Sequence, residues 1–298
     1  MPLKDWLAAL VVIVAWGLNF VVIKHGLSEI PPLLLGALRF ILVAFPAVFF
    51  VKRPNLPWRI IVLYGLTISV GQFSFLFTAM YVGMPAGLAS LVLQSQAFFT
   101  ILIAAVFLRE RVHRHQMLGM SVAVAGLVLV GQGTGPAAVP MIGLALTLLA
   151  ALSWASGNIV IKGAGKIDMV GLVIWGALVP PLPFLALSWV FEGPQLMQES
   201  LANISYVGVL SVFYLAVVAT VIGYVLWGRL LSRHPASKVA PLSLLVPVIG
   251  LISSAWFLGE LLSFTQWIGG VVVLFGLMVN VFGRDLWQIV CKPTKALR

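Results

Sequence analysis

Long apolar stretches separated by short polar breaks run along the whole 298-residue chain. A helix needs about 20 apolar residues to cross a hydrocarbon core of roughly 30 Å, and ten stretches meet that requirement. The pattern therefore predicts an all-α integral membrane protein with ten transmembrane helices. The predicted spans cover residues 6–24, 32–51, 60–82, 85–108, 116–132, 140–161, 169–191, 205–228, 237–258 and 264–282.

The second half of this pattern repeats the first. An offset of 150 places, or of about 138 to 140 near the N-terminus, aligns Pro85 with Pro235, Glu110 with Glu260, Trp16 with Trp154 and Lys24 with Lys162. Because each half holds an odd number of spans, the second half is expected to be inverted in the membrane, as in many transporters. The predicted units are a first repeat over 6–132, an inverted second repeat over 140–282, and a cytoplasmic tail over 283–298.

Charge placement supports this layout and gives its orientation. Lys and Arg collect in cytoplasmic loops, and with the N-terminus inside, all 18 Lys and Arg residues except Lys24 and Arg39 fall on that side. Both termini are therefore expected in the cytoplasm. The net charge of +10 is spread over short loops, which argues against a nucleic-acid partner. Only 9% of residues are charged, against about 25% in soluble domains, so lipid is the expected solvent.

Several kinds of chemistry lack the residues they need. The predicted spans contain no Asp or Glu, and an intramembrane proton relay usually requires a carboxylate. His25, His113, His115 and His234 lie at span ends, so no His-Glu-x-x-His metal site or Ser-His pair is available. No Walker-type phosphate loop is present, and the single Cys291 rules out a disulfide. The sequence predicts a secondary carrier and not an enzyme, with no cofactor and no metal.

Arg39 is the most informative single residue, because it lies inside the second predicted span. A charged side chain at the bilayer centre costs about 3 kcal/mol, so it is expected to face protein or water. Two interpretations stay open: Arg39 binds the transported solute, or it snorkels outward or pairs with Glu29 and only fixes its helix. Arg39 aligns with Val179, and the second half has no matching cation.

Two pairs of aromatic and amide residues occupy corresponding spans of the two halves. Trp16 and Asn19 are three residues apart in the first span, and Trp154 and Asn158 are four apart in the sixth, so each pair shares a helix face. Transporters built from inverted repeats place their sites near the repeat interface. We expect both pairs to face a central cavity, although hydrogen bonding between helices would also explain the amides.

The third span carries small and polar residues at every third or fourth position, which indicates a water-accessible path or a close-packing face. In the fourth span, Gln94 is expected on one face, with Gln96 and Thr100 pointing elsewhere. The further candidates for solute binding, from these spans and from spans seven and eight, are Ser74, Thr78, Tyr81, Gln94, Trp175, Tyr214 and Tyr224.

Glycines spaced by seven residues mark two spans as structural. Gly119 and Gly126 lie in the fifth span, and Gly269 and Gly276 lie at the corresponding places of the tenth. Small residues at such spacing let helix backbones approach closely. The fifth and tenth spans are therefore expected to pack tightly and not to bind solute. Prolines such as Pro180 interrupt other spans, as gates or as packing kinks.

Four stretches resemble a known family. They are AWGLNFVVIK (15–24), PPLLLGALRFILVAFPAVFF (31–50), GMPAGLASLVLQSQAFFTIL (83–102) and APLSLLVPVIGL (240–251). The chain is similar, over residues 6 to 282, to the EamA family of the drug/metabolite transporter superfamily. The resemblance implies an inverted arrangement of five plus five helices, a central cavity lined by spans 1 to 4 and 6 to 9, and a supporting role for spans 5 and 10.

The resemblance also implies a function: export of small amino acids and derivatives, such as cysteine and O-acetylserine, from the bacterial inner membrane. In this hypothesis Arg39 binds the carboxylate, Asn19 and Asn158 bind the polar head, and the aromatic residues shape the pocket. The expected partners are a small-molecule solute and the lipid bilayer, and a monomer is the expected form. The alternatives are another solute, such as a nucleoside, an aromatic amino acid or a lipophilic compound, and an intramembrane or lipid-handling enzyme, which the missing catalytic groups disfavour.

Overall fold

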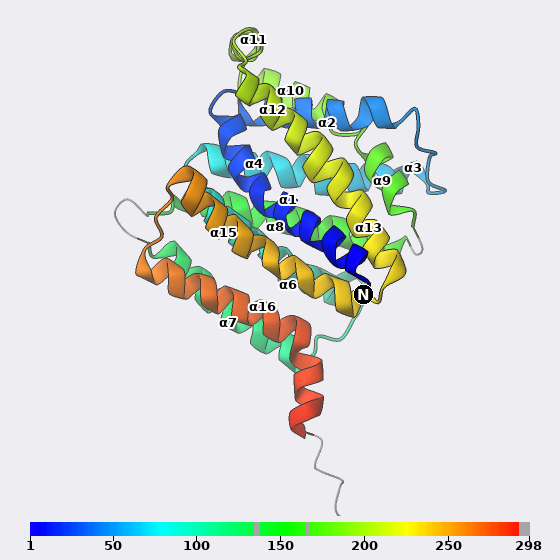
Figure 1. The fold of residues 1–298 in the computed structure, drawn as a ribbon, viewed down its shortest axis with the longest axis vertical. Coiled ribbons are helices and arrows are strands. Elements are labelled where there is room, and N and C mark those ends of the chain that lie inside the picture. Colours follow the sequence, from blue (N-terminus) through cyan, green and yellow to red (C-terminus); the bar gives the residue numbers. More distant parts are fainter. Residues whose placement is uncertain (134–137, 165–166, 292–298) are drawn as a thin grey trace, which may run out of the picture.

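The computed structural model describes residues 1–133, 138–164 and 167–291, and every regular element in this part of the chain is helical (Figure 1). Nine helical segments among these residues are long and apolar enough to cross a membrane, and α2 (Pro32–Ala47) is apolar but shorter. The fold is therefore the predicted ten-helix membrane fold. Besides α2, four of these spans are each a single helix: α1 (Leu3–Leu27), α7 (Arg114–Gly131), α8 (Met141–Gly163) and α16 (Phe264–Cys291).

The other five spans are each built from two or three pieces. They are α3 (Trp58–Tyr64), η1 (Gly65–Gly71) and α4 (Gln72–Tyr81); α5 (Ala86–Val92), η2 (Leu93–Ser95) and α6 (Gln96–Phe107); α9 (Met169–Gly176) and α10 (Pro181–Phe191); α12 (Tyr206–Phe213), η4 (Tyr214–Ile222) and α13 (Gly223–Arg233); and α14 (Ala236–Val239), η5 (Ala240–Leu244) and α15 (Leu245–Leu258). A short helix, α11 (Pro194–Ala202), follows the seventh span.

The irregular pieces recur in corresponding spans of the two halves. Both η1 and η4 are π-helical, in the third and eighth spans, and both η2 and η5 are 3₁₀-helical, in the fourth and ninth. A π-turn is wider and a 3₁₀ turn tighter than an α-turn, so each changes which residues face a given side further along the helix. The seventh span breaks instead at Pro180 and Pro181, where α10 begins.

Two boundaries differ from the predicted ones in ways that matter. The first span begins at Leu3 and so includes Asp5, which contradicts the expectation that no span holds a carboxylate. Asp5 is buried, and its carboxylate contacts the ring of His234 at 2.6 Å. His234 directly follows α13, the last helix of the eighth span. At the other end of the chain, residues 283–291 of the predicted tail continue α16, and residues 292–298 lie outside the described residues.

The spans α7 and α16 pack against each other at one side of the bundle, as Figure 1 shows. A Cβ atom on Gly119 would lie 2.6 Å from the carbonyl oxygen of Gly276, and one on Gly126 would lie 2.7 Å from that of Gly269. Any side chain there would collide with the partner backbone. The prediction that these glycines serve close packing of the fifth and tenth spans is confirmed.

On the other side of the bundle, α1 packs against α12, α13 and α15 and also contacts α4 and α5. Gly17 makes the approach of α15 possible, because a Cβ atom there would overlap the side chain of Ile249. Further out, α2 contacts α10, and α8 contacts both α4 and α6. Large apolar side chains such as Phe77, Phe184 and Ile23 are fully buried among these helices.

Two carboxylates cap helix N-termini at the end of the bundle opposite to the start of α1. Glu192 accepts hydrogen bonds from the backbone N–H groups of Leu33 at 2.6 Å and Leu34 at 3.1 Å, at the start of α2. Glu29 accepts from the backbone N–H and the hydroxyl of Ser205, at 3.0 and 2.7 Å, at the start of α12. A negative charge is favourable there, because the first N–H groups of a helix have no partner within it.

Candidate functional site

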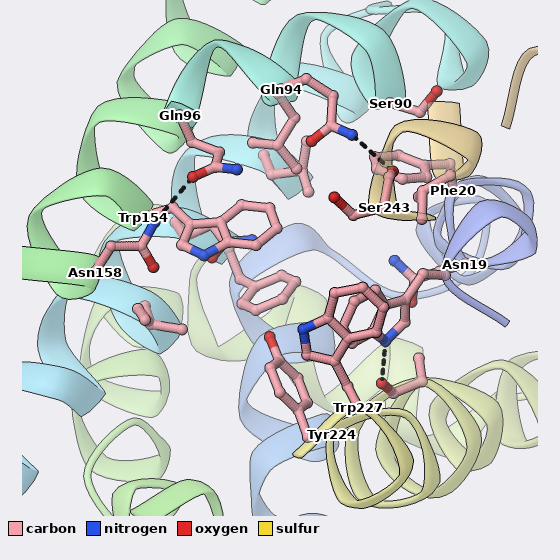
Figure 2. Close-up of a pocket in the computed structure, with 18 of the residues that line it drawn as sticks. Asn19, Phe20, Ser90, Gln94, Gln96, Trp154, Asn158, Tyr224, Trp227 and Ser243 are labelled. Atoms are coloured by element: carbon pink, nitrogen blue, oxygen red, sulfur yellow. Dashed lines mark hydrogen bonds between the residues drawn. The ribbon is translucent and has the colours of Figure 1, made fainter. Parts of the chain in front are cut away.

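A cavity of about 310 Å³ lies between the two halves of the bundle. Its lining comes from spans 1 to 4 and 6 to 9, and among the described residues neither α7 nor α16 contributes. Figure 2 shows Tyr224 and Trp227 on one side of this space, with Trp154 and Asn158 on another. The polar and aromatic residues that line it are Trp16, Asn19, Phe20, Arg39, Tyr64, Gln72, Phe73, Ser90, Gln94, Gln96, Trp154, Asn158, Tyr224, Trp227 and Ser243.

The cavity lies toward the end of the bundle where α1 begins. Its lining reaches Leu231 near the end of α13, Ile161 near the end of α8 and Met169 at the start of α9, all at that end. At the opposite end of the bundle, Met80 and Met84 are fully buried.

Arg39 is the one formally charged side chain among the described residues of the lining, and it is only 2% exposed. Its Nε and Nη2 groups donate hydrogen bonds to the hydroxyl of Thr220, at 3.2 and 2.8 Å. The guanidinium carbon lies 4.1 Å from the ring centroid of Phe73, which is a cation–π distance. In the described part of the chain no carboxylate pairs with it, and Nη1 has no partner.

This geometry excludes both structural roles considered for Arg39, snorkelling outward and pairing with Glu29. The side chain does not snorkel outward, because it is buried. It does not pair with Glu29, whose carboxylate is bonded to Ser205. A buried guanidinium with one free N–H edge is instead suited to an anionic group that enters the cavity.

Five amide side chains form much of the remaining polar lining. The side-chain oxygens of Asn19 and Gln72 are buried and have no partner within the described structure. Gln94 donates to the carbonyl oxygen of Ser243 at 3.2 Å, across the two halves. Asn158 donates to the side-chain oxygen of Gln96 at 2.9 Å. The free oxygens accept hydrogen bonds and therefore suit an N–H donor of a solute.

Aromatic rings provide the apolar wall. The ring of Trp16 lies 5.4 Å, centroid to centroid, from those of both Tyr224 and Trp227. Its indole N–H donates to the carbonyl oxygen of Ala219 at 2.9 Å, within η4. A carbonyl in a π-helix can be left free of the regular ladder, and here it holds the Trp16 ring in place. The wall is thus fixed across the first and eighth spans.

Seven of the twelve residues predicted to bind solute line this cavity in the structure. They are Trp16, Asn19, Arg39, Gln94, Trp154, Asn158 and Tyr224. Five others lie elsewhere in the described chain: Tyr214 donates to the carbonyl oxygen of Ala15, Trp175 donates to that of Val51, Tyr81 is 56% exposed, and Ser74 and Thr78 do not reach the lining.

The small and polar stripe of the third span consists of Tyr64, Thr67, Gly71, Ser74, Thr78 and Tyr81; Thr67 and Gly71 pack against α8, whereas Tyr64 lines the cavity. Ser153 of α8 donates to the carbonyl oxygen of Thr67, and a Cβ atom on Gly71 would collide with the same serine hydroxyl. The residues of this span that reach the cavity are instead spaced by four and are Tyr64, Ile68, Gln72 and Leu76, together with Phe73. The π-turns of η1 produce this spacing, because they hold more residues per turn than an α-helix.

Gln72 and Gln96 are therefore lining residues that the sequence pattern misses. The expectation that Gln96 points away from Gln94 is wrong: Gln94 lies within the tight turn η2, Gln96 follows it, and both line the cavity. No feature of an α-helical pattern would have indicated either residue. The polar character of Gln72 inside an apolar span was the available signal.

Within the described ranges, no group of three or more His, Cys, Asp or Glu residues could hold a metal ion. The lining offers one guanidinium, several amides and aromatic rings. Such groups bind a solute reversibly, with a few polar contacts for orientation and apolar contacts for shape.

In the described part of the chain, nine helices long and apolar enough to cross a membrane and one shorter apolar helix form a bundle with a polar-lined cavity, an arrangement typical of membrane transporters. The chain belongs to the EamA-like transporter family, whose profile matches residues 4–132 and 141–282. These two matches cover almost all of the ten spans.

Curated relatives and a solved structure agree with this assignment. The chain is 51% identical over 288 residues to a protein of Escherichia coli (strain K12) described as a probable amino-acid metabolite efflux pump, covering 95% of this chain and 96% of that one. It is 52% identical, with the same coverage, to a protein of Salmonella typhimurium with the same description. A protein of known crystal structure aligns with a TM-score of 0.62 and 19% identity over 93% of this chain and 97% of its own length, which shows a shared fold.

Proposed function

We propose that this protein exports small amino-acid metabolites across the bacterial inner membrane. The description of the two relatives that share half of its residues supports the amino-acid class. The observation that carries the proposal is the lining of the cavity, which combines one guanidinium edge without a partner with two amide oxygens without partners. These groups complement the carboxylate and the ammonium of an amino acid.

In the proposed complex, Nη1 of Arg39 binds the solute carboxylate. The ammonium donates to the side-chain oxygens of Asn19 and Gln72, which are 8% and 3% exposed and free of protein partners. Asn158 contributes its remaining carbonyl, since its amide nitrogen is bonded to Gln96 and Thr100. The solute side chain contacts the aromatic wall. A volume of about 310 Å³ is at the small end of ligand pockets and suits cysteine or O-acetylserine.

The proposed transport cycle is secondary and alternates the access of this cavity between the two membrane faces. We place both termini in the cytoplasm, because the basic residues collect on that side. The cavity then lies toward the cytoplasm, where a metabolite is captured for export. A monomer contains the complete cavity, so no second copy is required for binding.

Efflux from preloaded proteoliposomes tests the proposal. Radiolabelled cysteine and O-acetylserine are loaded into vesicles that contain the purified protein, with and without a pH gradient, and empty vesicles serve as the blank. Protein-dependent efflux of either solute is the expected result, and a gradient effect identifies proton coupling. Efflux of neither, from protein that is folded by size exclusion, would remove both solutes from the proposal.

A matched pair of variants tests the site. Arg39→Gln removes the charge from the cavity, and we expect loss of at least about 90% of efflux, since a charge-assisted hydrogen bond contributes about 1.5–3 kcal/mol. Arg53→Gln is the control, because Arg53 stacks on Trp58 outside the cavity. Equal efflux from both variants would exclude Arg39 as the carboxylate ligand.

A further inference from the structure

Arg39 can bind a carboxylate in a defined direction only if its guanidinium is held in place. We propose that Thr220 is the positioning residue that does this, so that Nη1 is the edge offered to the solute. The inference rests on the proposed function, because it assumes that Arg39 binds the solute carboxylate. It adds a residue of the eighth span that does not itself line the cavity.

The hydrogen bonds of the Thr220 hydroxyl leave it only as an acceptor for Arg39. Its proton is donated to the carbonyl oxygen of Leu215 at 2.8 Å, five residues earlier in the chain. A hydroxyl has one donor and two acceptor positions, so the two lone pairs remain for Nε and Nη2 of Arg39. Every hydrogen-bonding position of this hydroxyl is therefore used, and its orientation is fixed.

The π-helical geometry of η4 makes this arrangement possible. A hydrogen bond to the residue five places earlier follows the π-helical spacing, whereas threonines in α-helices bond four places back, as Thr147 does to Gly143. On its other face, the guanidinium lies against the ring of Phe73. The hydroxyl and the ring together restrict the rotation of the guanidinium, and the remaining N–H edge has no protein partner.

Comparison of the two halves shows that the fold does not require this pair. The offsets that relate the repeats place Val179 at the position of Arg39 and Val70 at the position of Thr220. The third span forms the same type of π-helix, η1, with a valine at this place. The polar contact is thus present between spans 2 and 8 and replaced by two valines in spans 7 and 3. Arg39 and Thr220 lie in different halves and their equivalent positions hold valines, so this contact has no symmetry-related counterpart, which indicates a role with the solute.

Three variants separate positioning from packing. Thr220→Val keeps the shape and removes the hydroxyl, and Thr220→Ser keeps the hydroxyl. Thr67→Val is the matched control: Thr67 lies in η1, its hydroxyl bonds only to carbonyls of its own helix, and it does not line the cavity. If Thr220→Val does not fold, Thr220→Ala replaces it, because alanine also lacks the hydroxyl and is smaller.

The first measurement is the initial rate of efflux at several internal concentrations of cysteine, and of cysteamine, which lacks the carboxylate. We expect Thr220→Val to raise the apparent KM for cysteine about tenfold with little change in maximal rate, and to leave cysteamine unchanged. Thr220→Ser should restore the wild-type KM for cysteine. A Thr220→Val variant that behaves like Thr67→Val for both solutes would overturn the inference.

The two proposals fail in different ways in this experiment. If Arg39→Gln does not alter the preference for cysteine over cysteamine, the carboxylate role of Arg39 is wrong, and the role of Thr220 falls with it. If Arg39→Gln removes that preference and Thr220→Val keeps it, only the inference is wrong. If both are right, adding Thr220→Val to Arg39→Gln should cause no further change in KM.

A second measurement needs no transported solute and covers the case in which the wild type exports neither probe. Phenylglyoxal modifies exposed guanidinium groups, and mass spectrometry of the peptide that contains Arg39 gives its rate of modification. We expect faster modification of Arg39 in Thr220→Val than in the wild type, Thr220→Ser and Thr67→Val, because the Nε and Nη2 groups are released. Equal rates in all four proteins would also overturn the inference.

Discussion

The carboxylate of Glu260 accepts a hydrogen bond from the backbone N–H of Ala86 at 2.7 Å, joining the end of the ninth span to the start of the fourth. A second bond, from the N–H of Gly87, is 3.0 Å long. The same carboxylate therefore satisfies two N–H groups that have no partner within α5. This contact crosses between the two halves, at the end of the bundle opposite to the start of α1.

Removal of this carboxylate should lower stability. We expect Glu260→Ala to reduce the free energy of unfolding by about 1–2 kcal/mol, the usual value for a lost N-terminal cap. Thermal unfolding in detergent is the measurement, with Glu199→Ala on the exposed helix α11 as control. The capping role is wrong if the two variants unfold at the same temperature.

The glycines between α7 and α16 permit a sharper test of packing. Gly126→Leu places a side chain where even a Cβ atom would lie 2.7 Å from the carbonyl oxygen of Gly269, so the two helices must separate. We expect a loss of about 2 kcal/mol or more, or failure to fold. Gly163→Leu is the control, because nothing lies within 4 Å of a Cβ atom there. Similar melting temperatures for both variants would contradict this close contact.

The π-helix η1 predicts which residues of the third span affect transport. Gln72→Leu removes a free amide from the cavity lining, so it should raise the KM for the exported solute several-fold. Ser74→Ala changes a polar residue two positions later that does not reach the lining, and its KM should equal that of the wild type. Kinetics that reverse this order would show that the span has the register of a regular α-helix.

Acid should weaken the junction between α1 and α12. The pKa of the Glu29 carboxyl is below its ordinary value of 4.5, mainly because the hydroxyl and then the backbone N–H of Ser205 donate to it. A lowered pKa means that the folded protein holds this proton less tightly than the unfolded chain. The resulting stabilisation is complete above about pH 4.5 and is lost as the pH falls through the folded-state value.

Glu29→Gln tests this pH dependence. The melting temperature of the wild type should fall as the pH is lowered from about 5 to below 4, and the variant should lose part of that slope because its side chain does not titrate. The comparison is made in one detergent and at constant ionic strength. Parallel pH profiles for the two proteins would remove Glu29 from the explanation.

The sequence predicts most of the fold because membrane spans depend on apolar length alone. It also predicts the cavity residues that lie on regular helices, such as Trp16 and Asn19 on α1 and Trp154 and Asn158 on α8. Each of these pairs faces the cavity because an α-helix places residues three or four apart on one side.

The sequence pattern gives the wrong residues where a span changes from α-helix to another helical type, or where the hydroxyl or indole N–H of an aromatic side chain donates to a backbone carbonyl. Gln72 and Gln96 follow η1 and η2, so extrapolation at 3.6 residues per turn assigns them to the wrong faces. Residue type alone makes Tyr214 and Trp175 candidates for solute binding. Their donors instead satisfy backbone carbonyls between helices, and contacts between distant segments cannot be read from local spacing.

The matching π-helices in the third and eighth spans indicate how the two halves of the protein evolved. An irregularity that recurs 150 residues apart is most simply inherited from a single five-helix ancestor that existed before the gene was duplicated. Arg39 in the first copy and Thr220 in the second have valines at their equivalent positions, Val179 and Val70, and so record the divergence that followed. If Arg39 binds the solute as proposed, the solute lies off the axis that relates the two copies and enters an almost symmetrical protein in one orientation.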